Sequence, residues 1–142
     1  MRRHSRKKKI VAATGKTIRC VAILSSREMV NEDLAERIEN KQMNRINEFA
    51  GRNNMIIMHT IRYGIMGPMV RREKFDQAIR SMRSGKADAI VTTNVWNISE
   101  GIRDGYDKLG AVHEAGFHLY SIDDKETRLN LYIPPLSIEK GV

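Results

Sequence analysis

Residues 85–104, GKADAIVTTNVWNISEGIRD, decide the fold of this chain. They combine a turn at Gly85, a short apolar strand over residues 87–92, a polar loop and the start of a helix at Ile102. Within this strand, residues 89–91 (AIV) are apolar in succession, without polar alternation. Such a run is typical of a strand buried on both faces of a parallel sheet. We therefore expect a strand–loop–helix unit of an α/β protein here.

The same alternation of strand and helix extends along the rest of the chain. Apolar runs predict strands, and apolar residues three and four apart predict helices. The expected strands are residues 18–24, 55–61, 87–92 and 117–122, with a short fifth at 129–133, and the expected helices are 29–52, 73–84 and 102–115. The fold class is therefore α/β, with three layers: a largely parallel sheet of four to five strands and helices on both faces.

Three local patterns predict where helices begin and which residues they bury. Residues 63–72, YGIMGPMVRR, contain Gly and Pro and are predicted to form a loop. Ser25-Ser26-Arg27-Glu28 fits a capping box, with Ser25 as N-cap and Glu28 three residues later. The spacing in the last helix predicts an inward face made of Ile102, Tyr106, Leu109 and Val112.

The positive charge is concentrated at the start of the chain. Residues 1–16 hold seven of the 25 basic side chains and no acidic one, so the other residues are nearly balanced, with 18 basic and 17 acidic. Such a block buries little and repels itself, which predicts a disordered tail. Its expected partner is DNA, bound non-specifically; a solubilising tail or a cloning remnant is the alternative. The basic residues are Arg2, Arg3, Arg6, Lys7, Lys8, Lys9 and Lys16.

Length and composition restrict the class of protein further. The 142 residues suit this tail, one α/β domain over 17–128 and a short extension over 129–142, with no separate DNA-binding domain. No apolar run reaches the roughly 18–20 residues of a membrane span, and no signal peptide is recognisable. Cys20 is the single cysteine, which predicts a buried side chain and a cytoplasmic protein. We expect no cofactor and no metal, because the histidines lack ligand spacing; they are His4, His59, His113 and His118.

Five short segments, in this order and spacing, resemble one known family. They are residues 21–24 (VAIL), 42–50 (QMNRINEFA), 64–67 (GIMG) followed by Arg72, 85–91 (GKADAIV), and 98–99 (IS) with 102–104 (IRD). Together they are similar to the catalytic domain of serine recombinases, the resolvase/invertase family, over roughly residues 18–124. In that family a serine attacks a DNA phosphodiester and becomes linked to the 5′ phosphate, while arginines bind the phosphate. The resemblance implies a resolvase-like fold and a role in DNA recombination.

The family's catalytic positions are mostly substituted in this chain. Alignment without gaps from residue 21 puts Ser26 in place of an arginine and Glu28 in place of the nucleophilic serine. A carboxylate at the second position repels phosphate. Arg72 keeps the loop arginine and Ser99 keeps a second serine, so the resemblance leaves Arg72, Ser26 and Ser99 as remnants of the catalytic site. An aspartate and two arginines of the family are replaced by Trp96, Asn97 and Glu100.

These substitutions favour a recombinase-fold protein that is catalytically impaired. It would be a DNA- or recombinase-binding accessory or regulatory module, acting through its tail, by self-association or as a heteromer with an active recombinase. The alternatives are an active minimal serine recombinase that makes a phosphoserine DNA intermediate, and an unrelated α/β nucleic-acid-binding protein. In the impaired site, we expect Trp96 to cover the strand ends near Ser26 or residues 64–72. Arg72 is then expected to pair with Glu28 or Glu100.

Overall fold

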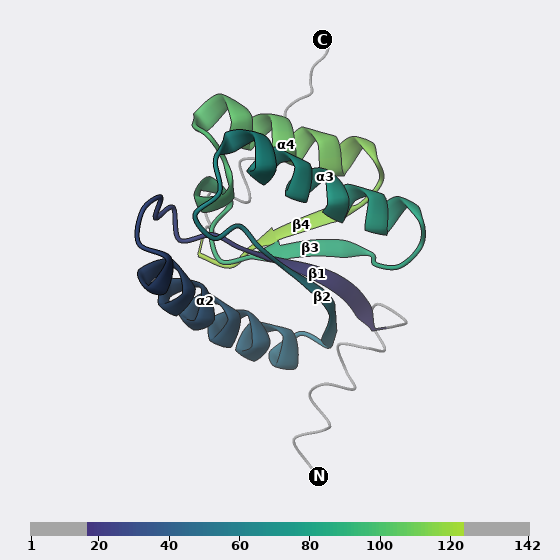
Figure 1. Cartoon of the computed structure of the whole chain (residues 1–142). Helices are drawn as coiled ribbons and strands as arrows, with labels where there is room; N and C mark the ends of the chain where they lie inside the picture. Colours follow the sequence, from purple (N-terminus) through teal and green to yellow (C-terminus); the bar gives the residue numbers. More distant parts are fainter. Residues whose placement is uncertain (1–16, 124–142) are drawn as a thin grey trace.

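The computed structural model describes residues 17–123, which form a sheet of four parallel strands between two layers of helices. The strand order is β2-β1-β3-β4. Helix α2 covers one face, and α3 and α4 lie side by side on the other (Figure 1). The elements are β1 (Ile18–Leu24), α2 (Glu32–Arg52), β2 (Met55–Arg62), α3 (Pro68–Arg83), β3 (Ala89–Thr92), the 3-10 turn η1 (Val95–Ile98), α4 (Ile102–Glu114) and β4 (His118–Ser121). The predicted three-layer α/β fold is confirmed. The basic tail, the expected strand at 129–133 and the extension lie outside the described residues.

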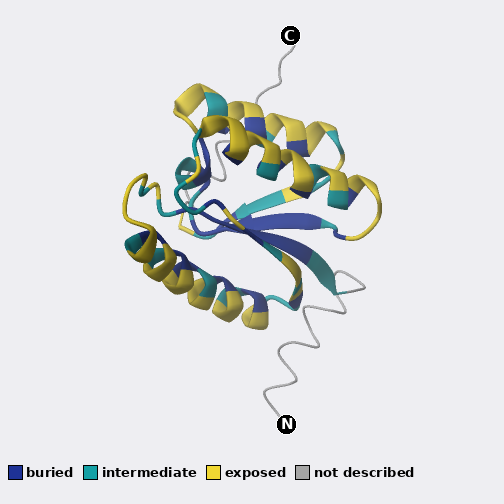
Figure 2. Cartoon of the chain, viewed as in Figure 1, coloured by how far each residue is buried: buried dark blue, intermediate teal, exposed yellow. Residues whose placement is uncertain are grey.

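The side chains of β1 alternate between two apolar cores, one on each face of the sheet. Val21 and Ile23 join the core beneath α3 and α4, whereas Cys20, Ala22 and Leu24 join the core beneath α2. Figure 2 shows the central strands buried and the outer faces of the helices exposed. Because β1 is covered on both faces, it has to be apolar at every one of these positions.

Helix α2 begins later than the sequence predicts. The Asn31 side chain caps it, so the first helical residue is Glu32 and the helix does not reach back to residue 29. The predicted capping box with Ser25 as N-cap is therefore wrong. The Glu28 carboxylate instead accepts hydrogen bonds from the amides of Asn31 and Val30, at 2.9 and 3.0 Å, and these bonds lower the pKa of Glu28.

Helix α3 begins earlier than the sequence predicts. Its first residue is Pro68, preceded by Gly67 as N-cap, so residues 68–72 are helical and the predicted loop over 63–72 is wrong in its second half. Proline suits this position because its missing N–H has no partner in the first turn and its φ is already helical. The earlier start puts Arg71 on the helix face that buries Phe75, four residues further on.

Helix α4 turns only the second half of the predicted face toward the sheet. Val112 is buried and Leu109 packs against the core, as predicted, whereas Ile102 and Tyr106 are exposed, so their predicted inward positions are wrong. The residue that governs the close approach is Gly105, where a Cβ atom would lie 2.2 Å from the ring of Trp96. The helix therefore packs against η1 through a position without a side chain.

Some features expected from composition can be checked within residues 17–123. Cys20 is a free, buried cysteine, and its burial raises the pKa of the thiol to about 12. None of the helices in this range has both the length and the apolar character needed to cross a bilayer. Within the same range, no three His, Cys, Asp or Glu side chains come together in a way that could hold a metal ion.

Candidate functional site

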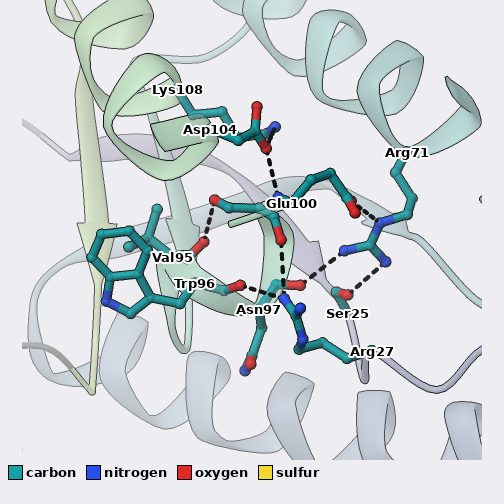
Figure 3. A network of polar contacts seen from close by, with 10 residues as sticks. Ser25, Arg27, Arg71, Val95, Trp96, Asn97, Glu100, Asp104 and Lys108 are labelled. Atoms are coloured by element: carbon teal, nitrogen blue, oxygen red, sulfur yellow. Dashed lines mark hydrogen bonds and ion pairs between the residues drawn. The ribbon is translucent and has the colours of Figure 1, made fainter. Parts of the chain in front are cut away.

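The candidate site lies at the carboxyl edge of the sheet, where open parallel sheets bind their ligands. All four strands end at this edge, so the segments that follow them are neighbours. Ser25 follows β1, residues 63–67 lead from β2 into α3, and residues 93–101 connect β3 with α4. Figure 3 shows the Ser25 hydroxyl, the Asn97 carbonyl and the Glu100 carboxylate converging on Arg71.

Arg71 is the centre of this network. Its side chain is 4% exposed, and each of its guanidinium nitrogens donates to a protein oxygen (Figure 3). Nε donates to Oε2 of Glu100 at 2.5 Å, Nη1 to Oγ of Ser25 at 3.1 Å, and Nη2 to the carbonyl of Asn97 at 3.1 Å. The guanidinium carbon also lies 4.6 Å from the ring centroid of Tyr63, which is within cation–π range. Arg71 therefore joins the segments that follow β1, β2 and β3.

Helix α2 fixes the position of Ser25. The Ser25 amide donates to Oε1 of Gln42 at 2.9 Å, and Nε2 of Gln42 donates to the Ser25 carbonyl at 2.8 Å. One turn earlier, Oε2 of Glu39 accepts a hydrogen bond from the amide of Gly64 at 2.8 Å. Both acceptors on α2 are buried, so the helix holds two strand ends with side chains that sit inside the fold. The Ser25 hydroxyl is thereby aimed at Arg71.

Arg27 is a second arginine at the same edge. Its Nη1 donates to the carbonyls of Trp96 and Ser99, at 2.6 and 2.9 Å (Figure 3). The backbone of Arg27 has a φ of 68°, a left-handed conformation that residues other than glycine adopt rarely. Arg27 therefore ties the segment after β1 to the segment after β3.

The segment after β3 is closed by its own hydrogen bonds. The Asn94 side chain accepts from the Trp96 amide at 2.8 Å, which starts η1, and the Ser99 hydroxyl donates to the Val95 carbonyl at 2.7 Å. Gly101 then turns the chain into α4 with a φ of 122°, which glycine accommodates readily. This segment presents its carbonyl groups, rather than basic side chains, to Arg27 and Arg71.

Glu100 is held in place from α4. Its amide donates to Oδ2 of Asp104 at 2.7 Å, and the same oxygen accepts from Nζ of Lys108 at 2.6 Å. Burial alone would raise the pKa of Asp104, but the hydrogen bonds from Lys108 and from the Glu100 amide outweigh it and lower that pKa. The backbone of Glu100 is therefore anchored while its carboxylate, 39% exposed, reaches Arg71.

The three predicted catalytic remnants do not meet at one place. Arg72 is exposed and forms no ion pair within residues 17–123; its expected pairing is wrong by one residue, since Arg71 takes Glu100. The Ser26 hydroxyl accepts a hydrogen bond from the Glu28 amide at 2.9 Å. Ser99 is buried, with its hydroxyl engaged inside its own segment. The structure instead brings together Ser25, Arg27 and Arg71, which no sequence motif marked as a site.

Trp96 lies elsewhere than expected. Its ring packs against α4, over Gly105 and edge-on to Tyr106, with ring centroids 5.6 Å apart and planes at 71°. It does not pack near Ser26 or residues 64–72 as the sequence analysis predicts; Figure 3 shows the indole pointing away from Ser25 and Arg71. The part of Trp96 that reaches the site is its carbonyl, which binds Arg27.

The charges at the site determine what it can bind. Arg71 and Arg27 would attract an anion beside the Ser25 hydroxyl, because guanidinium groups bind phosphate and carboxylate with paired hydrogen bonds. In this chain Glu100 already supplies the anion for Arg71, and Nη1 of Arg27 already donates to two carbonyl oxygens. A phosphate group would have to displace the carboxylate of Glu100 in order to reach Arg71.

Comparison with solved structures relates the chain to catalytic domains of recombinases. A resolvase family site-specific recombinase from Streptococcus pneumoniae matches with a TM-score of 0.66 and 17% identity, over 82% of this chain and 81% of that one. The N-terminal catalytic domain of TP901-1 integrase matches with a TM-score of 0.63 and 13% identity, over 75% and 79%. The C-terminal catalytic domain of ISC1926 TnpA, an IS607-like serine recombinase, matches with a TM-score of 0.60 and 13% identity, over 79% and 75%.

These matches define the class of fold. The chain has the α/β fold of serine recombinase catalytic domains, and the predicted resemblance is confirmed at that level. This shared fold argues against the alternative of an α/β protein with an unrelated fold. No family model and no curated protein matches the sequence, so the likeness is carried by the structure.

Proposed function

We propose that this chain is a recombinase-fold protein that does not carry out strand transfer and serves as an accessory module in DNA recombination. The observation that carries the proposal is the ion pair between Arg71 and Glu100. Phosphoryl transfer needs positive groups that are free to stabilise the charge developing on the phosphate. A carboxylate bound to the central arginine cancels that charge and repels the substrate.

The position of Ser25 supports the same proposal. Its hydroxyl is the serine oxygen that Arg71 contacts, but the residue is 1% exposed. A nucleophile has to come within about 3–3.5 Å of the reacting phosphorus. A duplex cannot approach Ser25 that closely while Arg71, Glu100 and residues 96–99 stay in the arrangement of Figure 3.

Trapping of covalent protein–DNA complexes tests the loss of chemistry. The full chain is incubated with supercoiled and with nicked plasmid DNA, stopped with detergent and analysed for protein-linked DNA. We expect no adduct, with an active serine recombinase as the positive control. An adduct that disappears in Ser25→Ala and persists in Ser99→Ala would overturn the proposal and identify the nucleophile.

An active minimal recombinase is the second candidate, and the hydrogen bond between Arg71 and Ser25 is the observation that favours it. On that reading Glu100 moves aside when DNA binds, and Glu100→Gln raises cleavage. On the leading reading Glu100→Gln alone yields no cleavage, because nucleophile and arginines act as a unit and their effects are far from additive. The same adduct assay, run on this variant, separates the two.

The proposed DNA contact is the basic tail, residues 1–16, which lies outside the described part of the chain. Seven basic residues that engage about four to seven phosphates would give a log–log salt slope of roughly −3 to −6. Deleting residues 1–16 should remove most of the affinity for duplex DNA of any sequence and leave the thermal stability of the domain unchanged. Full affinity after the deletion would place the DNA contact on the domain. In this role the protein is cytoplasmic and binds DNA or an active recombinase.

A further inference from the structure

The two edges of the sheet carry charge of opposite sign. We compare the connections between strands and helices, each taken with two residues of the element on either side. The carboxyl edge has three basic and five acidic side chains, in residues 23–33, 61–69, 91–103 and 120–123. The amino edge has four basic and two acidic side chains, in residues 17–19, 51–56, 82–90 and 113–119. The excess of positive charge among these connections therefore lies at the amino edge, opposite to the candidate site.

Hydrogen bonds connect the segments of the amino edge through the start of β1. Nδ2 of Asn54 donates to Oγ1 of Thr17 at 3.4 Å, and the Ile18 amide donates to the Asn54 carbonyl at 3.2 Å. On the other side of β1, Nη1 of Arg19 donates to the Gly85 carbonyl at 2.9 Å. Figure 1 shows the ends of α2 and α3 on the same side of the molecule as the start of β1. These segments therefore form one continuous edge.

Arg83 and Lys86 are two cations of this edge whose charge is not neutralised. Both side chains are exposed, and neither forms an ion pair within residues 17–123. The nearest carboxylate in the chain, Asp88, is already bound, because it accepts hydrogen bonds from Nε and Nη2 of Arg19, at 3.1 and 2.9 Å. Arg83 and Lys86 are therefore placed to attract an external anion.

The basic tail joins the domain at this edge. Residues 1–16 hold seven basic side chains and no acidic one, and the sequence connects them to Thr17, the residue before β1. The candidate site lies at the other end of the same strand. At about 3.3 Å per residue, the seven residues Ile18–Leu24 separate the two edges by roughly 20 Å. An anion that binds at the amino edge is therefore far from Ser25.

We propose that the amino edge of the sheet binds the phosphate backbone of duplex DNA, through Arg83 and Lys86 together with the basic tail. The inference rests on the proposed DNA contact of the tail and adds the place on the domain where the duplex lies. Arginine and lysine bind backbone phosphates irrespective of base sequence. A duplex held at this edge presents no phosphodiester to Ser25, so an accessory module can hold DNA without cutting it.

Paired neutral substitutions in the full chain give the first test. Arg83→Gln with Lys86→Gln removes two cations from the amino edge. Arg72→Gln with Arg103→Gln is the matched control, because it removes the same charge from the carboxyl edge. All four side chains are exposed and form no ion pair within residues 17–123, so both variants should fold like wild type.

Fluorescence anisotropy of a labelled duplex of about 20 base pairs, between about 50 and 200 mM KCl, measures the binding. The amino-edge variant should bind at least about tenfold more weakly at about 0.1 M salt. Its log–log salt slope should be shallower by roughly two, because each phosphate contact contributes about 0.9. The carboxyl-edge control should keep the affinity and the salt slope of wild type.

Lysine footprinting gives a second test that reads position rather than affinity. Lys86 on the amino edge and Lys41 on α2 are both exposed. The wild-type chain is acetylated with and without saturating duplex, and the modified residues are quantified by mass spectrometry. Bound DNA should suppress most of the acetylation of Lys86 and leave that of Lys41 unchanged.

The outcomes separate this inference from the proposed function. Weaker binding of the amino-edge variant alone, with Lys86 protected, supports the inference. Unchanged affinity of that variant, or an unprotected Lys86, overturns it and leaves the tail as the DNA contact. A loss confined to the carboxyl-edge control also overturns it, by placing the duplex at the candidate site. If the wild-type chain binds no duplex DNA, the inference and the tail contact both fail, whereas the absence of strand transfer is still decided by the adduct assay.

Discussion

Replacing Glu100 by glutamine removes the negative charge beside Arg71 while keeping nearly the same shape. The wild-type pair joins a side chain that is 4% exposed to one that is 39% exposed. Breaking a fully buried pair costs about 3–5 kcal/mol, and a pair at the surface is worth about 0–1 kcal/mol. This pair lies between the two cases, and the glutamine oxygen still accepts one hydrogen bond from the charged guanidinium. We therefore expect a loss of about 2 kcal/mol in the free energy of unfolding.

The same substitution should create a place for an external anion. With the carboxylate gone, Arg71 remains buried and lacks a negative partner, so phosphate should bind beside it. A ligand at nine times its Kd stabilises the folded state by about 1.4 kcal/mol. Phosphate should therefore restore much of the stability that Glu100→Gln loses, while adding little to the wild-type chain, in which Glu100 occupies the position.

Urea denaturation at fixed ionic strength, with and without phosphate, measures both effects. Glu36→Gln is the matched control, because Glu36 is an exposed glutamate of α2 that forms no ion pair within the described residues. General salt effects on stability should be equal in this control, in Glu100→Gln and in wild type. The reasoning is refuted if Glu100→Gln lies within about 0.5 kcal/mol of wild type. Equal stabilisation of all three proteins by phosphate would refute it too.

Three further predictions follow from the packing and the protonation states. Gly105→Ala should destabilise the fold by about 1–3 kcal/mol in urea denaturation, because its Cβ would lie 2.2 Å from the Trp96 ring; Gly110→Ala, on the same helix in open space, should be neutral or stabilising. The pKa of Asp104 is lowered in the folded state, so its ion pair with Lys108 stabilises fully above the ordinary value of 3.8 and is lost as the pH falls through the lowered folded pKa. The stability advantage of wild type over Asp104→Asn should therefore shrink below about pH 4, and an advantage that is constant with pH would contradict this. Cys20, buried and with a thiol pKa raised to about 12, should resist iodoacetamide at pH 8 in the native protein and react once urea unfolds it, as mass spectrometry can show.

The strands and the layer order were predictable because burial on both faces leaves a clear signal. Residues 20–24 and 89–91 are continuous apolar runs, one in each of the two central strands. A buried parallel strand has no solvent face on which polar residues could interrupt the run. The loops and helix starts between these strands are set by single side-chain hydrogen bonds, which leave a weaker trace in the sequence.

The burial of Arg71 does have a signal in the sequence. Once Pro68 is taken as the first residue of α3, the buried face follows at helical spacing from Arg71 through Phe75 and Ala78 to Met82. If residues 63–72 are assigned to a loop, this periodicity is not apparent, and the family resemblance then indicates Arg72 instead of Arg71. A buried arginine also looks unfavourable from the sequence alone, since only the structure shows the three acceptors that satisfy it.

Helix α4 shows a case where the sequence is misleading. Ile102 and Tyr106 are more apolar than Lys108, yet they are exposed while Lys108 is buried. The cause is tertiary: Gly105 admits the Trp96 ring, and Asp104 with the Phe75 ring satisfies the Lys108 ammonium. Contacts of α4 with η1 and α3, together with one ion pair inside α4, decide which residues turn inward, and helical periodicity does not report them.

The central claim is that Glu100 occupies the place of a substrate anion on Arg71. A crystal structure of the wild-type chain grown from concentrated ammonium sulfate tests it most directly, because sulfate resembles the phosphate group in size and charge. We predict that Nε of Arg71 donates a hydrogen bond to the Glu100 carboxylate and that no sulfate is bound between Arg71, Arg27 and Ser25. A sulfate bound there, with Glu100 turned out to solvent, would contradict the account and support an active phosphodiester site.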